Sequence, residues 1–176
     1  MMDKLTLVKT SIDYENQIWE YRSEFLESGE HLAGCAGLES ATSVEEWLEL
    51  LQNMSSEETV PCNFVPATSY LAIRESDDRV VGMLQIRHRL NDYLEALGGH
   101  IGYSVRNSER QKGYAKEMLR LGIEEAQNLG IDKILITCHD DNPASEKTIL
   151  ANGGIFDSAI PHGEKLMKRY WIHGVS

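Results

Sequence analysis

The spacing of hydrophobic and polar positions changes several times along the chain, and each change predicts a new element. The first part of the chain predicts a short strand over residues 5–8 and a helix over residues 14–26. A second helix begins after Ser43, because Ser43 and Glu46 form the capping-box pattern of a helix start. The segments between these elements are rich in Gly, Ser and Pro and predict loops.

The middle of the chain has strand-like patterns. Residues 70–74 and 79–89 flank the turn-forming run Ser-Asp-Asp and predict a hairpin, and residues 100–106 predict a third strand. The strongest amphipathic pattern follows over residues 113–129, with apolar residues on one face and charged residues on the other.

The last third predicts a buried strand over residues 133–138, a short helix over residues 143–151 and a final strand over residues 165–172. Antiparallel strands are thus followed by a strand, helix, strand unit. This order predicts an α/β fold, a mixed and mostly antiparallel sheet flanked by helices on both faces. The absence of repeats and linkers predicts one domain over residues 1–176.

The composition narrows the possible partners. The chain has 28 Asp and Glu against 17 Lys and Arg, a formal net charge of −11. A surface this acidic repels phosphate backbones, so we expect no nucleic-acid partner. Three cysteines and six histidines lack disulfide or metal-ligand spacing, so we expect no metal. No segment predicts a signal peptide or a membrane span, which favours a cytoplasmic protein.

The segment from Arg110 to Ala115 resembles an anion site at the start of a helix. The first N–H groups of a helix have no internal partners, and the helix dipole adds partial positive charge there. Gly113 would let the backbone approach a bound group, and Arg110 and Lys112 would add full charges. This arrangement predicts a pyrophosphate site, although the G-x-G-x-x-G and Walker patterns are absent.

The same six residues, Arg-Gln-Lys-Gly-Tyr-Ala, fit the Q/R-x-x-G-x-G/A signature of the GNAT acetyltransferases. They follow a strand that ends in Val and begin a long amphipathic helix, as in that family. The segment from Asn142 to Ser145 is similar to the Asn-x-x-Ser segment of the family. The resemblance covers residues 70–172 and implies acetyl-CoA as co-substrate, with an unidentified amine as acceptor.

The resemblance also implies which residues bind the coenzyme. The loop before the helix would hold the pyrophosphate, mainly through backbone N–H groups. The strand before it would pair with the pantetheine arm and offer an N–H to the thioester oxygen. The implied coenzyme-binding residues are Tyr103, Ser104, Val105, Arg110, Gln111, Lys112, Gly113, Tyr114, Ala115, Asn142 and Ser145.

The chain departs from the family pattern at the position of the general acid. Many members carry a Tyr seven residues after the Asn, but here that position is Ile149. Tyr170 and Tyr114 are substitutes by residue type, and water is a further proton source. As base we predict His100, which begins the third strand of the middle region, with Glu95, Asp92 and water as alternatives.

Residues 1–69 would select the acceptor, and residues 70–172 would form the acetyl-CoA core. Glutamates in the first region could attract a cationic amine or form a solvated helix face. Two alternative functions remain, a coenzyme A-binding module without turnover and an acyltransferase with a longer donor. A homodimer through an exposed strand edge is also left open.

Overall fold

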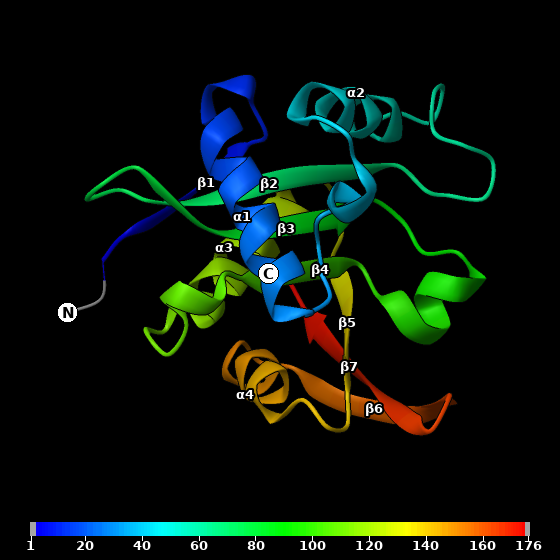
Figure 1. The fold of residues 1–176 in the computed structure, drawn as a ribbon. Coiled ribbons are helices and arrows are strands. Elements are labelled where there is room, and N and C mark those ends of the chain that lie inside the picture. Colours follow the sequence, from blue (N-terminus) through cyan, green and yellow to red (C-terminus); the bar gives the residue numbers. More distant parts are fainter. Residues whose placement is uncertain (1–2, 175–176) are drawn as a thin grey trace.

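The structure is a computed structural model that describes residues 3–174. Figure 1 shows helices on both sides of a layer of strands. The strands are β1 (Leu5–Lys9), β2 (Ala67–Arg74), β3 (Arg79–Arg87), β4 (Ile101–Val105), β5 (Lys133–His139), β6 (Ile155–His162) and β7 (Lys165–His173). The α-helices are α1 (Glu15–Ser28), α2 (Val44–Met54), α3 (Tyr114–Asn128) and α4 (Pro143–Ala151). The short helical turns are η1 (Ile12–Tyr14), η2 (Leu38–Ser40), η3 (Leu94–Gly98) and η4 (Asn107–Glu109).

The strands form two antiparallel sheets. One has the order β1-β2-β3-β4, and the other has the order β5-β7-β6. The predicted α/β class, with a mostly antiparallel arrangement and helices on both faces, is confirmed. Within residues 3–174, no helix combines the length and the apolar character needed to cross a bilayer.

Alternation along the strands of the first sheet creates two cores. In β2, Leu71 and Ile73 belong to the core with α1 and α2, whereas Tyr70 and Ala72 belong to the core with α3. Successive side chains of a strand point to opposite faces, so one strand serves both cores. Trp47 of α2 is 1% exposed in the first of these cores.

Two of the helices begin at side-chain caps. The Ser43 hydroxyl accepts a hydrogen bond from the Glu46 N–H at 3.1 Å, as the capping pattern predicts. The Asn142 side chain accepts one from the Ser145 N–H at 3.1 Å, and Pro143 occupies the first turn of α4. Both helix starts therefore follow from residues adjacent in the sequence.

The pattern of the sequence does not predict strand β6. Its residues are mostly exposed, Ile155 and Phe156 are large exposed apolar residues, and the strand contains Pro161. An edge strand with both faces in solvent has no alternating pattern to detect. The pattern also does not predict η3, a π-helical turn that lies where a plain connection is expected.

The two sheets meet between β4 and β5. The His100 N–H, directly before β4, donates to the Leu135 carbonyl of β5 at 2.7 Å. Beyond this contact β4 and β5 belong to separate sheets, and both Val105 at the end of β4 and Asn142 after β5 line a pocket. The contact between β4 and β5 is therefore limited to a junction at the start of β4.

Candidate functional site

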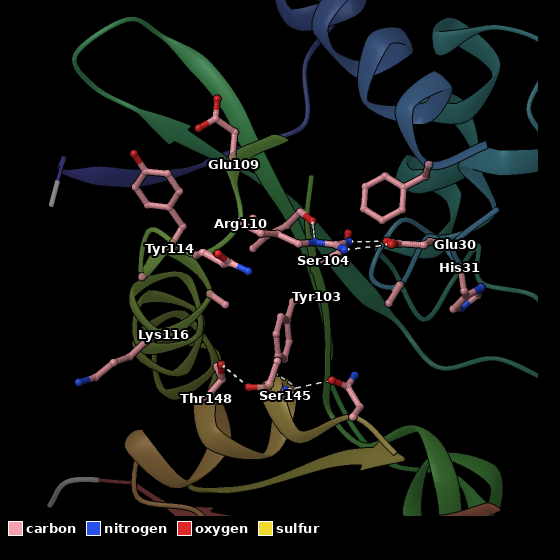
Figure 2. A pocket seen from close by; sticks show the side chains of 18 residues that line it. Glu30, His31, Tyr103, Ser104, Glu109, Arg110, Tyr114, Lys116, Ser145 and Thr148 are labelled. Atoms are coloured by element: carbon pink, nitrogen blue, oxygen red, sulfur yellow. Dashed lines mark hydrogen bonds and ion pairs between the residues drawn. The ribbon is translucent and has the colours of Figure 1, made fainter. Parts of the chain in front are cut away.

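A pocket of about 620 Å³ lies in the gap between β4 and α4 (Figure 2). Tyr114, Lys116 and Thr148 line it from the side of α3 and α4, and Glu30 and His31 line it from the opposite side. Both helical layers therefore contribute residues to the pocket. Every predicted coenzyme-binding residue except Lys112 lines it. These lining residues are Tyr103, Ser104, Val105, Arg110, Gln111, Gly113, Tyr114, Ala115, Asn142 and Ser145.

One end of the pocket is the N-terminus of α3. Gly113 precedes the helix with φ of 84°, and no side chain among the described residues caps it. Gln111 also has a positive φ, 62°, which is uncommon for a residue with a side chain. Backbone strain of this kind concentrates where a function requires it. The uncapped N–H groups and the left-handed turns together form a concave donor surface for an anion.

The charges of Arg110 and Lys112 are already paired in this structure. The Arg110 guanidinium contacts the Glu30 carboxylate at 2.6 Å, and its Nε donates to the Val105 carbonyl at 2.9 Å. The Lys112 ammonium contacts Glu109 at 2.8 Å. The sequence predicts that these charges add to an anion site formed mainly by backbone N–H groups. Their ion pairs with Glu30 and Glu109 leave the backbone N–H groups as the unpaired donors at this end of the pocket, among the described residues.

Glu109 holds the loop before α3 in place. It is 5% exposed and binds Arg74 and Arg79, each at 2.7 Å, in addition to Lys112. Burial by itself would raise the pKa of Glu109, but hydrogen bonds from Lys112, Arg74 and Arg79 outweigh it and lower the pKa to about 2. Glu109 is therefore ionised at neutral pH and anchors the loop to β2 and β3.

The open edge of β4 borders the pocket. The β3 register and the hydrogen bond from the Arg106 N–H to the Val81 carbonyl place Ser104 in a hydrogen-bonded pair with β3. The backbone groups of Tyr103 and Val105 therefore face the gap, whereas those of Ser104 do not. The Ser104 hydroxyl instead meets the Tyr21 hydroxyl at 2.8 Å.

Tyr103 crosses the gap from β4 to α4. Its hydroxyl lies 2.8 Å from the Ser145 hydroxyl, and Figure 2 shows its ring extending toward α4. Burial raises the pKa of Tyr103 to about 12, although the hydrogen bond with Ser145 opposes this shift. Tyr103 is thus a stable hydrogen-bond donor inside the pocket.

Of the residues predicted as acid or base, only Tyr114 lines the pocket. His100 is 6% exposed and outside the pocket lining, and its Nδ1 accepts a hydrogen bond from the Leu135 N–H at 2.9 Å. Burial, and then the nearby Arg87 charge, lower the pKa of His100 to about 4. This placement does not favour the predicted role of His100 as base. Asp92 and Glu95 also lie outside the lining.

The two tyrosines predicted to replace the usual acid already form hydrogen bonds with other residues. The Tyr170 hydroxyl donates to Glu146 and lies outside the lining. Tyr114 lines the pocket, but its hydroxyl accepts a hydrogen bond from Arg74 at 3.2 Å. Ile149, at the position where the family often has Tyr, is fully buried in the core. These positions provide no free proton donor.

The residues that line the pocket from α1 and the segment after it are not predicted by the sequence. Phe25, Glu30, His31 and Ala33 come from this region. They carry no motif, because only the packing of α1 against the sheet brings them to the gap. Within residues 3–174, no three side chains of His, Cys, Asp or Glu gather as a metal site would require.

The chain is similar to known proteins in sequence and in fold. A family model described as an acetyltransferase (GNAT) domain matches residues 36–155, more than half of the chain. The family model therefore matches a region that starts earlier than the resemblance seen in the sequence, which begins at residue 70. No curated protein sequence matches the chain at a significant level.

Many solved structures share the fold. A ribosomal L7/L12 alpha-N-protein acetyltransferase in complex with coenzyme A has a TM-score of 0.70 and 15% identity, covering 97% of this chain and 94% of its own. A ribosomal-protein-S5-alanine acetyltransferase from Vibrio fischeri has a TM-score of 0.67 and 16% identity, covering 99% and 95%. A spermidine N-acetyltransferase chimera from Vibrio cholerae and hSSAT has a TM-score of 0.65 and 13% identity, covering 96% and 94%.

Proposed function

The chain belongs to the GNAT acetyltransferase family, and from this premise we propose that it transfers an acetyl group from acetyl-CoA to an amine of a small molecule or peptide. The observation that carries the proposal is a pocket that combines the uncapped start of α3 with the open edge of β4. Residues of both helical layers line it, so both layers can provide groups that bind the donor and the acceptor. The named substrates of the similar structures, an alpha-amino group and spermidine, are amines.

The coenzyme fits the pocket in one direction. Its pyrophosphate would accept hydrogen bonds from the N–H groups around Gly113 and Tyr114. Its pantetheine arm would lie along β4, where the backbone groups of Tyr103 face the gap. The Val105 N–H or the Tyr103 N–H would then donate to the thioester oxygen as negative charge develops there. Bound acetyl-CoA supplies the activated acetyl group.

We propose direct attack in a ternary complex. The amine nitrogen forms a bond to the thioester carbon, the carbon–sulfur bond breaks, and the thiolate takes the electron pair. An alkyl ammonium titrates near ~10, so it must lose a proton before it attacks. His31 is the candidate base, because it lines the pocket and an imidazole nitrogen can accept a proton. Glu30 is less suited, because its carboxylate pairs with Arg110.

The departing thiolate needs stabilisation that Ile149 cannot give. The hydroxyl groups of Tyr103 and Ser145 are the donors that the pocket offers instead. Because the pKa of Tyr103 is about 12, this hydroxyl donates a hydrogen bond to a thiolate but does not surrender its proton. The thiolate would take its final proton from solvent.

We expect Tyr103→Phe and Ser145→Ala each to lower kcat by about tenfold, with little change in the acetyl-CoA KM. A hydrogen bond to a charged group contributes roughly 1.5–3 kcal/mol, and this one forms as the sulfur becomes negative. Steady-state thiol release measures the effect, with Tyr93→Phe as a matched control because Tyr93 is 62% exposed and outside the pocket. Unchanged kcat in both variants would remove the hydroxyl pair from the mechanism.

We propose that the two regions of the chain have different roles. Residues 1–69 would select the acceptor, and residues 70–172 would form the coenzyme core. In support, the segment after α1 provides Glu30 and His31 to the pocket, whereas the N-terminus of α3 forms the end of the pocket where we propose that the pyrophosphate binds. We also propose a cytoplasmic location, which agrees with three cysteines that are all free.

The proposed function is tested by two linked measurements on the purified chain. Calorimetry with acetyl-CoA should show binding, and a panel of polyamines, amino acids and peptides should then contain an amine that triggers thiol release. Absence of binding would contradict the coenzyme assignment. Binding without thiol release over the panel would favour a non-catalytic coenzyme A module, and tighter binding of a longer acyl donor would favour a different acyltransferase.

A further inference from the structure

The junction of the two sheets depends on one residue. The Leu135 carbonyl accepts a hydrogen bond from the His100 N–H at 2.7 Å, and the Leu135 N–H donates to Nδ1 of the same histidine at 2.9 Å. Both backbone groups of Leu135 are therefore satisfied by His100, one by its backbone and one by its side chain. In a continuous parallel ladder, two different residues of the neighbouring strand would provide these partners.

The fold brings the two strands unusually close at this point. Gly99 has φ of 69°, and a Cβ atom there would lie 2.6 Å from the Leu135 carbonyl oxygen. Nearby, the Thr137 hydroxyl donates to the Leu97 carbonyl at 2.7 Å. Beyond the junction, β4 and β5 separate around the pocket. The junction therefore sets where the separation of the strands begins.

The hydrogen bond from Leu135 defines the state of the imidazole. Nδ1 accepts, so the proton of the neutral ring must be on Nε2. Protonation of Nδ1 would replace the acceptor with a donor and break the contact. Burial opposes protonation, and so does the Arg87 guanidinium of β3, which binds the carbonyls of Gly98 and Gly99 at 3.1 Å and 3.4 Å.

We propose that His100 is a positioning residue whose neutral imidazole joins the two sheets and thereby sets the width of the gap that holds the coenzyme. Its importance for coenzyme binding rests on the proposed function. The junction itself does not, because it consists of hydrogen bonds within the chain.

The test compares two substitutions. In His100→Asn, the side-chain amide oxygen takes the place of Nδ1 and keeps an acceptor, whereas His100→Leu keeps bulk but offers no acceptor. We expect His100→Leu to lose hydrogen-exchange protection at the Leu135 amide by at least about tenfold and to raise the acetyl-CoA Kd by a similar factor. His100→Asn should stay within about threefold of the parent in both measurements.

Kinetics separates positioning from catalysis. A positioning residue changes the acetyl-CoA KM more than kcat, and Asn rescues it. Loss of kcat in both variants, with unchanged KM, would instead assign His100 as the base and overturn the proposal. A His100→Leu protein with parental exchange and parental Kd would overturn it as well.

The parent protein provides an independent measurement if His100→Leu does not fold. A long-range ¹H–¹⁵N spectrum at pH 7 should show His100 neutral, with its proton on Nε2. A ring protonated on Nδ1 would contradict the junction. If the parent fails to bind acetyl-CoA, the proposed function fails, while the exchange and tautomer results still decide the structural role.

Discussion

Gly113→Asp should weaken acetyl-CoA binding by at least about 100-fold while the protein remains folded. Two effects combine in this substitution. Gly113 has φ of 84°, a conformation that costs a residue with a Cβ atom about 1–2 kcal/mol. The new carboxylate would also lie at the N–H groups that the pyrophosphate needs and would repel it. About 3 kcal/mol of lost binding corresponds to the expected change in Kd.

The matched control for this substitution is Gly130→Asp. Gly130 has φ of 89° and follows the opposite end of α3, and apart from its chain neighbours no atom lies within 4 Å of the position that a Cβ atom would take. It therefore carries a similar backbone strain outside the pocket. Calorimetry should show parental acetyl-CoA affinity for this control. Equal loss of affinity in both variants would mean that strain, not the anion site, explains the effect.

His31→Gln should lower kcat/KM for the amine by about 100-fold near neutral pH. General base catalysis contributes roughly 10²–10⁴-fold, and we expect the low end because His31 is exposed and would act through water. The amine itself should impose a pH dependence in both proteins, because an alkyl ammonium must lose a proton before it attacks.

The control for His31→Gln is His173→Gln. His173 is an exposed histidine of β7 outside the pocket lining, so its replacement should leave kcat/KM unchanged. Acetyl-CoA binding should be close to parental in both variants. An unchanged kcat/KM in His31→Gln would exclude His31 as the base and leave proton removal to water or to another group.

Much of the fold was accessible from the sequence, because its signals are local. The capping pattern at Ser43 and the long amphipathic face of α3 depend on residues within one or two helical turns. The hairpin of β2 and β3 depends on alternation and a short turn. Strand β6 was not predicted, because an exposed edge strand has no local pattern of apolar and polar residues.

The candidate site also has a part that the sequence predicts and a part that it does not. The segment from Arg110 to Ala115 could be recognised because consecutive residues form the turn and the helix start. The partners of its charged side chains could not be recognised. Glu30 is 80 residues from Arg110, and its position beside the loop depends on how α1 packs.

The sequence by itself determined most of the elements, the turn before α3 that we predict to bind an anion, and the family, because each depends on backbone conformation and periodicity over neighbouring residues. Tertiary structure alone decided which side chains meet. It placed His31 in the pocket, brought the Tyr103 hydroxyl to Ser145, and placed the His100 ring against the Leu135 N–H, 35 residues away. Burial and the charges of distant elements set the pKa of a side chain, so a histidine that resembles a base in the sequence became part of a sheet junction.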